Sequence, residues 1–487
     1  MKQYAVTFQP DNIQIKVDEG TTLLHAEIAA GLQPDAPCGG KGTCKKCRVE
    51  LDGQEVLACQ TAVDRDMTVV IPRNAAARIL TQGLAEAVTP DGANDYAIAF
   101  DIGTTTVVAY LMDGHTGALL ANASCINPQT QFGADVISRI QHSMAGGREE
   151  LKACIRGALD ALTRETAKKA GVDPAAITAG AIVGNTAMHH LLLGIEPTPL
   201  VTPPYMPAVF EALELPAEGI LPISGTVRIA PNIAGFVGGD TVGCLVATRF
   251  DELSDLTLMI DIGTNGEMVL GSREHRIACS TAAGPAFEGA KISCGMRGTT
   301  GAVDHVWLED GKVAFHVIGE GEAVGLCGSG LLDLVAVLLD TGDIEESGRM
   351  PDKQYTLEGT GVTLLQKDVR EVQLAKSAIR AGIELLAEKL GVKVEDIRQV
   401  DLAGAFGNYM NPASACRIGM IPPVLRERVV PIGNAAGEGA KACALNRDIY
   451  RYSQDLAKGT EFLELASMPQ FQDMFVDCLE FSEEEDG

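Results

Sequence analysis

Hydrophobic and polar residues alternate along the first part of the chain in a way that predicts a small mixed unit of strands and a helix. The segments Tyr4–Phe8 and Ile13–Val17 alternate like the two strands of a hairpin, and the apolar spacing over Thr21–Ala30 predicts a helix. Two further strands are predicted at Arg48–Leu51 and Met67–Ile71. A Gly-rich segment separates the predicted helix from the third strand, so we expect a loop with unusual backbone freedom there.

A second pattern, a buried strand followed by a glycine turn and another strand, occurs twice in the rest of the chain. Tyr96–Phe100 leads into Asp101-Ile-Gly-Thr-Thr-Thr, and Leu256–Ile260 leads into Asp261-Ile-Gly-Thr-Asn-Gly 160 residues later. An ordinary tight hairpin with Asp as a turn former would explain either copy alone. Chance does not readily repeat Asp-Ile-Gly-Thr after a buried strand, so the pair predicts a duplicated unit that binds phosphate.

Residues 72–95 separate these two regions. They contain Pro, Gly and Ala without a sustained strand pattern, although Ala75–Ala87 could form a short helix. The sequence therefore predicts a first domain over residues 1–75, a linker over 76–94, and a domain of two lobes over 95–487.

Composition and charge narrow the range of functions. A chain of 487 residues with 46% hydrophobic residues can bury large cores. A formal net charge of -26, with no compensating basic block, disfavours binding to nucleic acid or to an anionic membrane. The longest apolar stretch, Leu331–Leu339, is interrupted by Asp333, which predicts an amphipathic helix far shorter than the roughly 20 residues of a membrane span. We expect a cytoplasmic protein with a frayed acidic tail at Glu480–Gly487.

Four of the 13 cysteines are clustered with the spacing C-x5-C-x2-C-x11-C, namely Cys38, Cys44, Cys47 and Cys59. An iron–sulfur cluster needs thiolates that converge from a loop with one more distant anchor, and the neighbouring glycines let backbone N–H groups approach the sulfurs. A structural zinc site usually shows two C-x2-C pairs where this chain has one, and disulfides are disfavoured because no secretory segment is visible. The remaining cysteines are scattered and are expected to be buried small residues in a reducing, anaerobic cytoplasm, among them Cys279, Cys294, Cys327 and Cys416.

The cysteine pattern and the elements around it resemble the plant-type ferredoxins of the β-grasp class over about residues 1–75. The resemblance implies an α+β β-grasp fold and a [2Fe-2S] cluster held by the four clustered cysteines. One departure is that Cys59 follows Cys47 after only 11 intervening residues, much sooner than in photosynthetic ferredoxins.

The residue types in the two Asp-Ile-Gly-Thr segments suit phosphate binding. Glycine lets backbone N–H groups approach phosphate oxygens, and short Thr and Asn side chains add hydrogen bonds without bulk. The candidate ligands are Gly103, Thr104, Thr105, Thr106, Gly263, Thr264, Asn265 and Gly266. We expect Asp101 and Asp261 to face each other across a cleft and to hold Mg²⁺ through water, because Mg²⁺ takes one or two carboxylates together with phosphates.

These segments resemble the phosphate motifs of the actin, sugar kinase and Hsp70 superfamily, from about residue 95 to 470. The resemblance implies an actin-like α/β ATPase domain, a duplicated RNase H-like unit whose two halves clamp ATP. Other Gly-rich turns fall where that fold has ligand contacts; they contain Gly328, Ser329 and Gly330, then Gly404 and Gly407, and finally the helix start Ile432–Gly439. Close helix packing would explain each of these turns equally well when it is taken alone.

Two other segments have both a structural and a functional interpretation. Asn185 ends a strand and starts a helix, so it is either a helix N-cap or a ligand contact. His189 and His190 are expected to be helix residues and not metal ligands, because adjacent helix residues point about 100° apart. Glu288 follows Pro285 in a predicted first helical turn, where it either positions the attacking water or is simply an acid favoured near a helix N-terminus.

Taken together, the two regions resemble the reductive activators of corrinoid-dependent enzymes over nearly the whole chain. The resemblance implies that an electron passes to the cobalt(II) of a corrinoid protein in a methyltransferase or O-demethylase system, with ATP making the step possible. It also implies an upstream electron donor and a homodimer. The chain lacks the extra domain that some members insert between the two regions. Two alternatives stay open: a nucleotide-sensing electron-transfer scaffold, and an ATP-dependent activator of a radical dehydratase, which would hold a [4Fe-4S] cluster between subunits.

Overall fold

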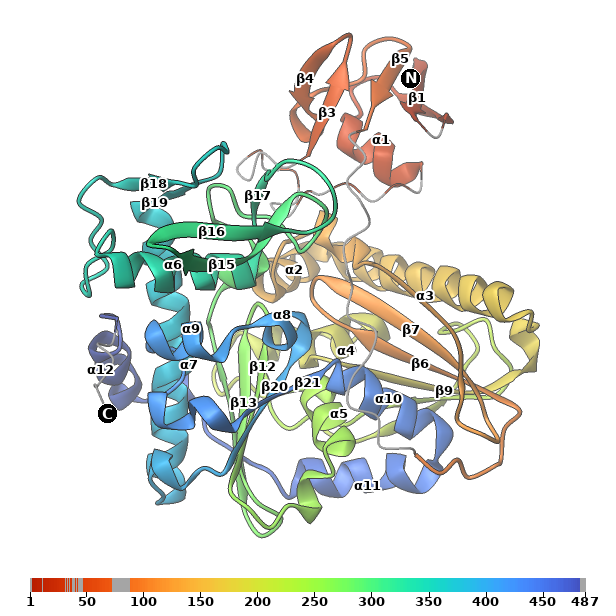
Figure 1. The fold of residues 1–487 in the computed structure, drawn as a ribbon. Coiled ribbons are helices and arrows are strands. Elements are labelled where there is room, and N and C mark those ends of the chain that lie inside the picture. The colour runs from red at the N-terminus through yellow and green to blue at the C-terminus, as the bar shows by residue number, and fades with distance from the viewer. Residues whose placement is uncertain are drawn as a thin grey trace.

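The computed structural model describes most of the chain, and its strands form five sheets within the described residues (Figure 1). The described residues are 2–10, 12–30, 32, 34, 36, 40, 42, 47–71 and 88–481. No helix in these parts of the chain is long and apolar enough to cross a membrane.

The N-terminal sheet has the strand order β2-β1-β5-β3-β4. Its elements are β1 (Gln3–Gln9), β2 (Ile13–Asp18), α1 (Leu23–Ala29), β3 (Arg48–Leu51), β4 (Gln54–Leu57) and β5 (Met67–Val70). The first and last strands lie parallel beside each other, and the apolar side of α1 covers the core of the sheet. Every predicted element of this region is therefore present, and the predicted α+β fold is confirmed.

Strand β4 was not predicted. It follows a turn in which Asp52 and Gly53 both have positive φ, 53° and 78°. An Asp-Gly pair between two short strands is a strong hairpin signal, because both residues tolerate the left-handed conformation that such a turn requires. The sequence therefore contained the information for this strand.

Two six-stranded sheets form the core of the remaining chain, with the orders β10-β11-β9-β6-β7-β8 and β21-β20-β12-β13-β14-β22. The strands of the first sheet are β6 (Tyr96–Ile102), β7 (Thr106–Asp113), β8 (Leu119–Ile126), β9 (Ile177–Gly184), β10 (Leu213–Pro216) and β11 (Thr226–Ile229). Those of the second are β12 (Thr257–Ile262), β13 (Gly266–Gly271), β14 (Arg276–Thr281), β20 (Gln399–Ala403), β21 (Val429–Gly433) and β22 (Glu461–Phe462).

The two sheets repeat one arrangement. In each, the strand before an Asp-Ile-Gly-Thr turn pairs antiparallel with the strand after it and parallel with a strand on its other side, β9 in the first sheet and β20 in the second. The predicted duplicated actin-like fold is therefore confirmed.

Helices cover both sheets, and smaller sheets extend the second lobe. The helices are α2 (Val136–His142), α3 (Arg148–Ala170), α4 (Thr186–Leu193), α5 (Gly239–Ala247), α6 (Gly328–Thr341), α7 (Gln366–Leu390), α8 (Gly404–Tyr409), α9 (Pro412–Arg417), α10 (Ala435–Leu445), α11 (Arg447–Lys458) and α12 (Pro469–Asp477). The small sheets consist of β15 (Ala302–Glu309), β16 (Lys312–Val317) and β17 (Gly325–Leu326), and of β18 (Gln354–Thr356) and β19 (Thr363–Leu365).

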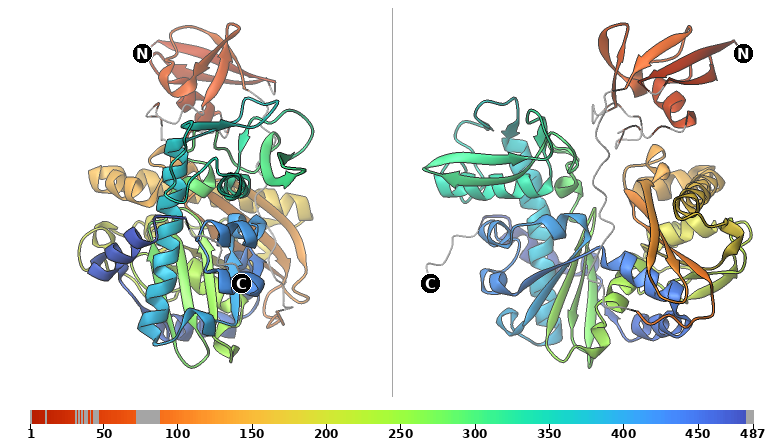
Figure 2. Two further views of the ribbon diagram at one scale, coloured as in Figure 1. Left: turned by 60° about the vertical axis from the view of Figure 1, so that its left-hand side comes forward. Right: turned by 45° about the vertical axis from the view of Figure 1, so that its right-hand side comes forward.

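Helices α5 and α10 share one apolar core with both sheets and so join the two lobes. In the right-hand view of Figure 2 the lobes stand side by side and meet at one end. The two helices approach each other at Gly243 and Gly439, where a Cβ on Gly439 would lie 2.0 Å from the Gly243 carbonyl oxygen. Because only glycine permits this approach, these positions fix how the helices cross.

Helix α6 differs from its predicted character. We expected an amphipathic helix because Asp333 interrupts the apolar run, but the helix is buried on all sides and Asp333 is only 1% exposed. Ser414 of α9 donates to the Asp333 carboxylate at 2.6 Å, the Val306 N–H donates to it at 3.3 Å, and the His305 ring lies 3.2 Å from it. These partners satisfy the buried carboxylate, so the predicted exposed face is wrong.

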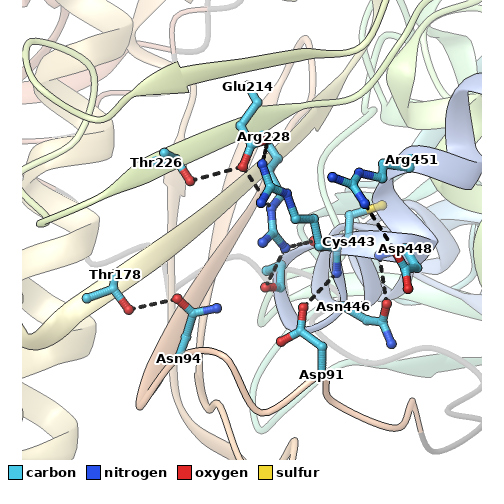
Figure 3. A network of polar contacts seen from close by, with 12 residues as sticks. Asp91, Asn94, Thr178, Glu214, Thr226, Arg228, Cys443, Asn446, Asp448 and Arg451 are labelled. Carbon is cyan, nitrogen blue, oxygen red and sulfur yellow. Dashed lines mark hydrogen bonds and ion pairs between the residues drawn. The ribbon is translucent and has the colours of Figure 1, made fainter.

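The last residues of the predicted linker are fixed to the ATPase-like region. The Asp91 N–H donates to the Leu445 carbonyl at 3.0 Å, the Asp91 carboxylate accepts from the Arg447 N–H at 2.9 Å, and the Asn446 amide donates to the Thr89 carbonyl at 3.0 Å. Figure 3 shows Asp91 and Asn446 near Arg228, which donates to the Cys443 carbonyl at 2.8 Å. We name residues 89–91 with the corner 445–447 the linker anchor. Residues 76–87 of the predicted linker, and with them the candidate helix at 75–87, lie outside the described residues.

The C-terminal tail is also more ordered than predicted, as far as it is described. Lys376 donates to the Glu480 carbonyl, and the Phe481 N–H donates to the Glu346 carbonyl at 2.8 Å. The Phe481 ring is buried beneath the Lys376 ammonium group. The expected fraying is therefore wrong for Glu480 and Phe481, and residues 482–487 lie outside the description.

Candidate functional site

A cavity of about 310 Å³ lies between the turns of the two Asp-Ile-Gly-Thr hairpins. Its walls come from the β6–β7 and β12–β13 turns and from the N-terminal ends of α5, α6, α8 and α10. The sequence-predicted residues that line it are Asp101, Gly103, Thr104, Thr105, Thr106, Asn185, Asp261, Gly263, Thr264, Asn265, Glu288, Gly328, Ser329 and Gly404. Candidates from both halves of the chain therefore converge on one cavity.

The two hairpin turns face each other across one carboxylate. In the first turn the Gly103 N–H donates to the Thr106 carbonyl at 2.8 Å, which closes the loop tightly. The Glu288 carboxylate accepts from the Thr264 hydroxyl at 3.0 Å and from the Thr105 hydroxyl at 3.4 Å. Glu288 lies in a short helical turn that begins at Pro285, as predicted. Its carboxylate thus connects the phosphate-binding candidates of both lobes.

Six carboxylates line the cavity, namely Asp304 and five others whose pKa values burial raises; the five are Asp101, Asp240, Asp261, Glu267 and Glu288. Burial raises the pKa of Asp101 to about 6, and burial with neighbouring negative charges raises the pKa of Asp240 and of Asp261 to about 7. The pKa of Glu267 lies well above its usual range for the same two reasons, and burial raises the pKa of Glu288. Without a cation, Asp240 and Asp261 are therefore partly protonated at neutral pH, whereas Asp101 is mostly ionised.

The donor set fits a magnesium ion that arrives with a nucleotide. Among the described residues, no group of three or more His, Cys, Asp or Glu side chains is placed to hold a metal by itself. Mg²⁺ commonly takes one or two carboxylates and completes its shell with water and phosphate oxygens. Such a cation would also neutralise the repulsion that raises the pKa of Asp261.

The sequence analysis did not name four charged residues of the cavity, Asp240, Glu267, Arg297 and Asp304, and it named Asn434 only as part of the helix start Ile432–Gly439. The Asn434 amide donates to the Asp101 carboxylate at 2.9 Å and to the Tyr110 hydroxyl at 3.0 Å, while its own oxygen caps α10. Asp240 follows a Gly-Gly pair at the start of α5, and this Gly-Gly-Asp helix start is the signal that could have found it. Glu267 stands one position beyond the second predicted phosphate segment.

Aromatic rings and one glycine form another part of the cavity wall. The rings of Phe287 and Phe406 stack with centroids 4.5 Å apart and planes 11° apart, and Tyr409 lines the same wall. Gly404 has a φ of 82°, and a Cβ there would lie 2.6 Å from Asp261 Oδ1. Glycine is therefore required at position 404, both for backbone conformation and for space beside the carboxylate.

Three of the predicted ligand glycines do not line the cavity: Gly266, Gly330 and Gly407. A Cβ on Gly330 would lie 2.1 Å from the Val303 carbonyl oxygen, and one on Gly407 would lie 3.2 Å from Leu402 Cβ. A Cβ on Gly266 would lie 3.0 Å from the Thr281 hydroxyl oxygen. For these positions the structure favours close packing between elements, the alternative that the sequence left open.

Asn185 is the N-cap of α4 and also lines the cavity. Its oxygen accepts from the Met188 N–H at 3.0 Å as the N-cap of α4, and its amide donates to the Thr104 hydroxyl at 2.9 Å at the cavity. His189 and His190 are buried residues of α4, as predicted. Burial lowers the pKa of His189 to about 3, so its ring is neutral.

The cysteine site is described in part. Cys38 and Cys44 lie outside the described residues, whereas Cys47 and Cys59 are both buried in the core of the N-terminal sheet. Cys47 immediately precedes β3, and Cys59 lies in a short helical turn after β4. The Ala58 N–H donates to the Cys47 carbonyl at 2.7 Å, which keeps the backbones of these two cysteines close together. Two thiols at one end of the sheet fit half of a four-cysteine ligand set.

Comparisons with known proteins cover all three parts of the chain. Family descriptions match as "2Fe-2S iron-sulfur cluster binding domain" at residues 6–68, "RACo middle region" at 96–253, and "C-terminal domain of RACo the ASKHA domain" at 255–486. The chain is 32% identical to the corrinoid activation enzyme RamQ of Eubacterium limosum, over 95% of this chain and 97% of that protein.

Two further similarities agree with these. The chain is 30% identical to the [Co(II) methylated amine-specific corrinoid protein] reductase of Methanosarcina barkeri, over 55% of this chain and 54% of that one. A solved structure described as a reductive activator for corrinoid, iron-sulfur protein is 29% identical, has a TM-score of 0.73, and matches over 98% of both chains.

Proposed function

We propose a function from the fact that this chain belongs to the RACo family of reductive activators of corrinoid proteins. The chain transfers an electron to the cobalt(II) of a corrinoid protein and restores cobalt(I) with the help of ATP. The observation that carries the proposal is the combination, in one chain, of a ferredoxin-like sheet with buried cysteines and a two-hairpin cavity lined by carboxylates and hydroxyls. A ferredoxin alone has no use for the cavity, and a kinase has no use for the cysteines.

The cysteines supply the electron-transfer half of the proposal. Cys38, Cys44, Cys47 and Cys59 would hold a [2Fe-2S] cluster, which supplies one-electron chemistry at low potential when bound. Each cobalt(II) that is reduced takes up one electron, and an upstream electron donor replaces it. The sheet holds Cys47 and Cys59 in its apolar core.

The cavity supplies the ATP-dependent half. We assign the hydroxyls of Thr104, Thr105 and Thr264 to the phosphates, and Asp101 with Asp261 to a magnesium ion held partly through water. Other proposed contacts are the backbone and side chains of Gly103, Thr106, Gly263, Asn265, Gly328, Ser329 and Gly404.

Glu288 is placed to orient the attacking water in hydrolysis. Its carboxylate lies between the two hairpin turns, and its pKa is raised by burial, which suits a group that accepts a proton. In this assignment the water oxygen bonds to the terminal phosphorus, the bond to the ADP oxygen breaks, and the water proton passes to Glu288. Gly266, Gly330 and Gly407 do not line the cavity, so we assign them no contact with ATP.

The natural partner in this proposal is a corrinoid protein of a methyltransferase or O-demethylase system, and the active form is a homodimer. The net charge of -26 suits a partner with a basic docking surface, because opposite charges steer association.

The experiment that tests the proposal follows a cobalt(II) corrinoid protein optically under anaerobic conditions, with a chemical reductant and with or without ATP. The intact chain is expected to generate cobalt(I) with reductant and ATP together and far less with reductant alone. If ATP makes no difference, the chain is a nucleotide-sensing scaffold. If no corrinoid protein is reduced and the iron is present as a [4Fe-4S] cluster between subunits, the radical-dehydratase activator takes its place.

A further inference from the structure

Two buried side chains hold the first phosphate-binding turn from the side away from the cavity. Asn127 follows β8 and Arg139 lies in α2, and both are 0% exposed. The Asn127 amide donates to the Gly103 carbonyl at 2.9 Å, and the Asn127 backbone N–H donates to the Thr105 carbonyl at 2.8 Å. The Arg139 guanidinium donates to the Thr104 carbonyl between them. Three consecutive carbonyl groups are therefore engaged from behind.

Peptide geometry then fixes where the N–H groups of the turn point. In a trans peptide the C=O of one residue and the N–H of the next point in opposite directions. The carbonyls of Gly103 and Thr104 point toward Asn127 and Arg139, so the N–H groups of Thr104 and Thr105 point the other way. In the described chain neither of these N–H groups has a protein acceptor. Both residues line the cavity, and two free donors there suit an anion.

Arg139 also brings a positive charge that makes no direct ion pair with a carboxylate in the described chain, although Asp135 and Glu288 are near enough to act on it. Its three contacts are the Gly133 carbonyl at 3.0 Å, the Met188 sulfur at 3.4 Å and the Thr104 carbonyl, all of them neutral. Burial lowers the pKa of Arg139 to about 10, so the guanidinium stays charged at neutral pH. Charged groups are almost never fully buried unless an opposite charge is near. Glu288, one of the two acids that act on Arg139, lines the cavity, so the charge of Arg139 reaches the place where phosphates would bind.

The second turn is built differently. There the Thr264 carbonyl accepts from the Gly284 backbone N–H at 3.0 Å, and the Gly263 N–H donates to the Asn265 carbonyl at 2.9 Å. At Thr264 a neutral backbone N–H thus takes the place that the Arg139 guanidinium takes at Thr104, and the Gly263–Asn265 bond corresponds to the Gly103–Thr106 bond of the first turn. The charge of Arg139 thus stands behind the first turn of a cavity whose lining presents six carboxylates and one arginine, Arg297.

We propose that Arg139 and Asn127 are positioning residues for the phosphate chain of ATP. They hold the carbonyls of residues 103–105 away from the cavity so that the N–H groups of the turn face the phosphates, and Arg139 offsets the phosphate charge from behind the turn. This inference rests on the proposed function in that the ligand is ATP. It is independent of whether the electron reaches cobalt.

The test measures how the full chain binds adenosine, ADP and ATP by calorimetry in the presence of Mg²⁺. For Arg139→Gln we expect the affinity for ATP to fall about 10- to 100-fold, the range expected for a lost hydrogen bond to a charged group. The loss should shrink from ATP to ADP and be absent for adenosine, because only the phosphates meet the turn. Arg139→Lys, which keeps the charge but not the fork, should recover part of the ATP affinity.

The matched control is Arg276→Gln. Arg276 is also a buried arginine with neutral acceptors, the Thr460 hydroxyl at 2.9 Å and the Leu456 carbonyl at 3.3 Å, but it lies outside the cavity lining. The Arg276→Gln variant should leave the ratio of the ATP affinity to the adenosine affinity unchanged. Equal losses for ATP and adenosine in Arg139→Gln, or the same pattern in the control, would overturn the proposal.

A second variant keeps the proposal testable if Arg139→Gln does not fold. Asn127→Asp has nearly the same shape but replaces the donor to the Gly103 carbonyl with a negatively charged acceptor. The Asn127→Asp variant should weaken the binding of ATP more than the binding of adenosine. An unchanged ratio of these two affinities would contradict the positioning role. Cobalt reduction by the unaltered chain separates this result from a failure of the proposed function, since a chain that binds ATP but reduces no corrinoid refutes only the latter.

Discussion

Replacing Gly404 by alanine should disable the nucleotide cavity through a single methyl group. The position has a φ of 82°, where an L side chain costs about 1–2 kcal/mol. The added Cβ would also lie 2.6 Å from Asp261 Oδ1, and overpacking of this kind typically costs about 1–3 kcal/mol. The total destabilisation is therefore about 2–5 kcal/mol, and part of it is relieved only by moving the Asp261 carboxylate.

The chain offers a control that isolates the second contribution. Gly391 ends α7 with a φ of 74°, is exposed, and has no atom within 4 Å of an added Cβ. Gly391→Ala should lose only the backbone term, about 1–2 kcal/mol in denaturant unfolding, and should hydrolyse ATP normally. Gly404→Ala should lose more stability than Gly391→Ala. Its ATP turnover at low Mg²⁺ should fall at least about tenfold, because a loss of about 1.4 kcal/mol in the free energy of Mg²⁺ binding lowers the binding constant by a factor of ten. Equal turnover in the two variants would refute the reasoning.

Three other perturbations separate the parts of the molecule. Asp261→Asn should abolish magnesium-dependent ATP turnover while the iron and sulfide content measured by chemical analysis stays unchanged; loss of iron would show that the two regions are not independent. Cys47→Ser should reduce the [2Fe-2S] signal in electron paramagnetic resonance and stop cobalt(I) formation while ATP turnover continues, with the partly buried Cys154→Ser as its control; stoichiometric zinc without sulfide in the unaltered chain would contradict the cluster itself. The pKa values of Asp240 and Asp261 are raised to about 7, so the folded protein holds protons that the unfolded chain has released above about pH 4. Without Mg²⁺, stability should therefore fall as pH rises from about 4 to 7 and then level off, and the stabilisation by Mg²⁺ and ADP in thermal unfolding should be larger at pH 8 than at pH 5.5; a smaller effect at pH 8 would contradict the assignment of these acids to the cation.

Local pattern was sufficient for the elements that position the site. The strands before and after Asp101 and Asp261 can be predicted from the sequence, because the apolar residues of each strand and the glycine turn between the strands are consecutive in the chain. The repeat of one motif also predicted that the two turns would face each other, and both turns contact Glu288.

Local pattern was insufficient wherever a partner comes from far along the chain. Asn434 binds the Asp101 carboxylate across 333 positions, and nothing around Asn434 except a helix start marks it. Asp333 suggested an exposed helix face because its partner Ser414 lies 81 positions away. Gly330 and Gly407 could not be assigned to ligand or packing, because the atoms that crowd them belong to other elements.

The linker anchor has a consequence for how often the two regions can meet. It fixes the chain at Asp91 to the corner at Leu445, so only the 16 residues from 72 to 87 connect the end of the ferredoxin-like region to a point held on the ATPase region. A chain of that length spans at most roughly 60 Å, which confines the cluster-bearing region to a small volume around the anchor. Tethers of this size give effective concentrations on the order of millimolar, far above those of free proteins at micromolar levels. If a corrinoid protein docks on the ATPase region, it would therefore meet its electron source without any affinity between the two, and the ferredoxin-like surface would be left for the proposed upstream donor.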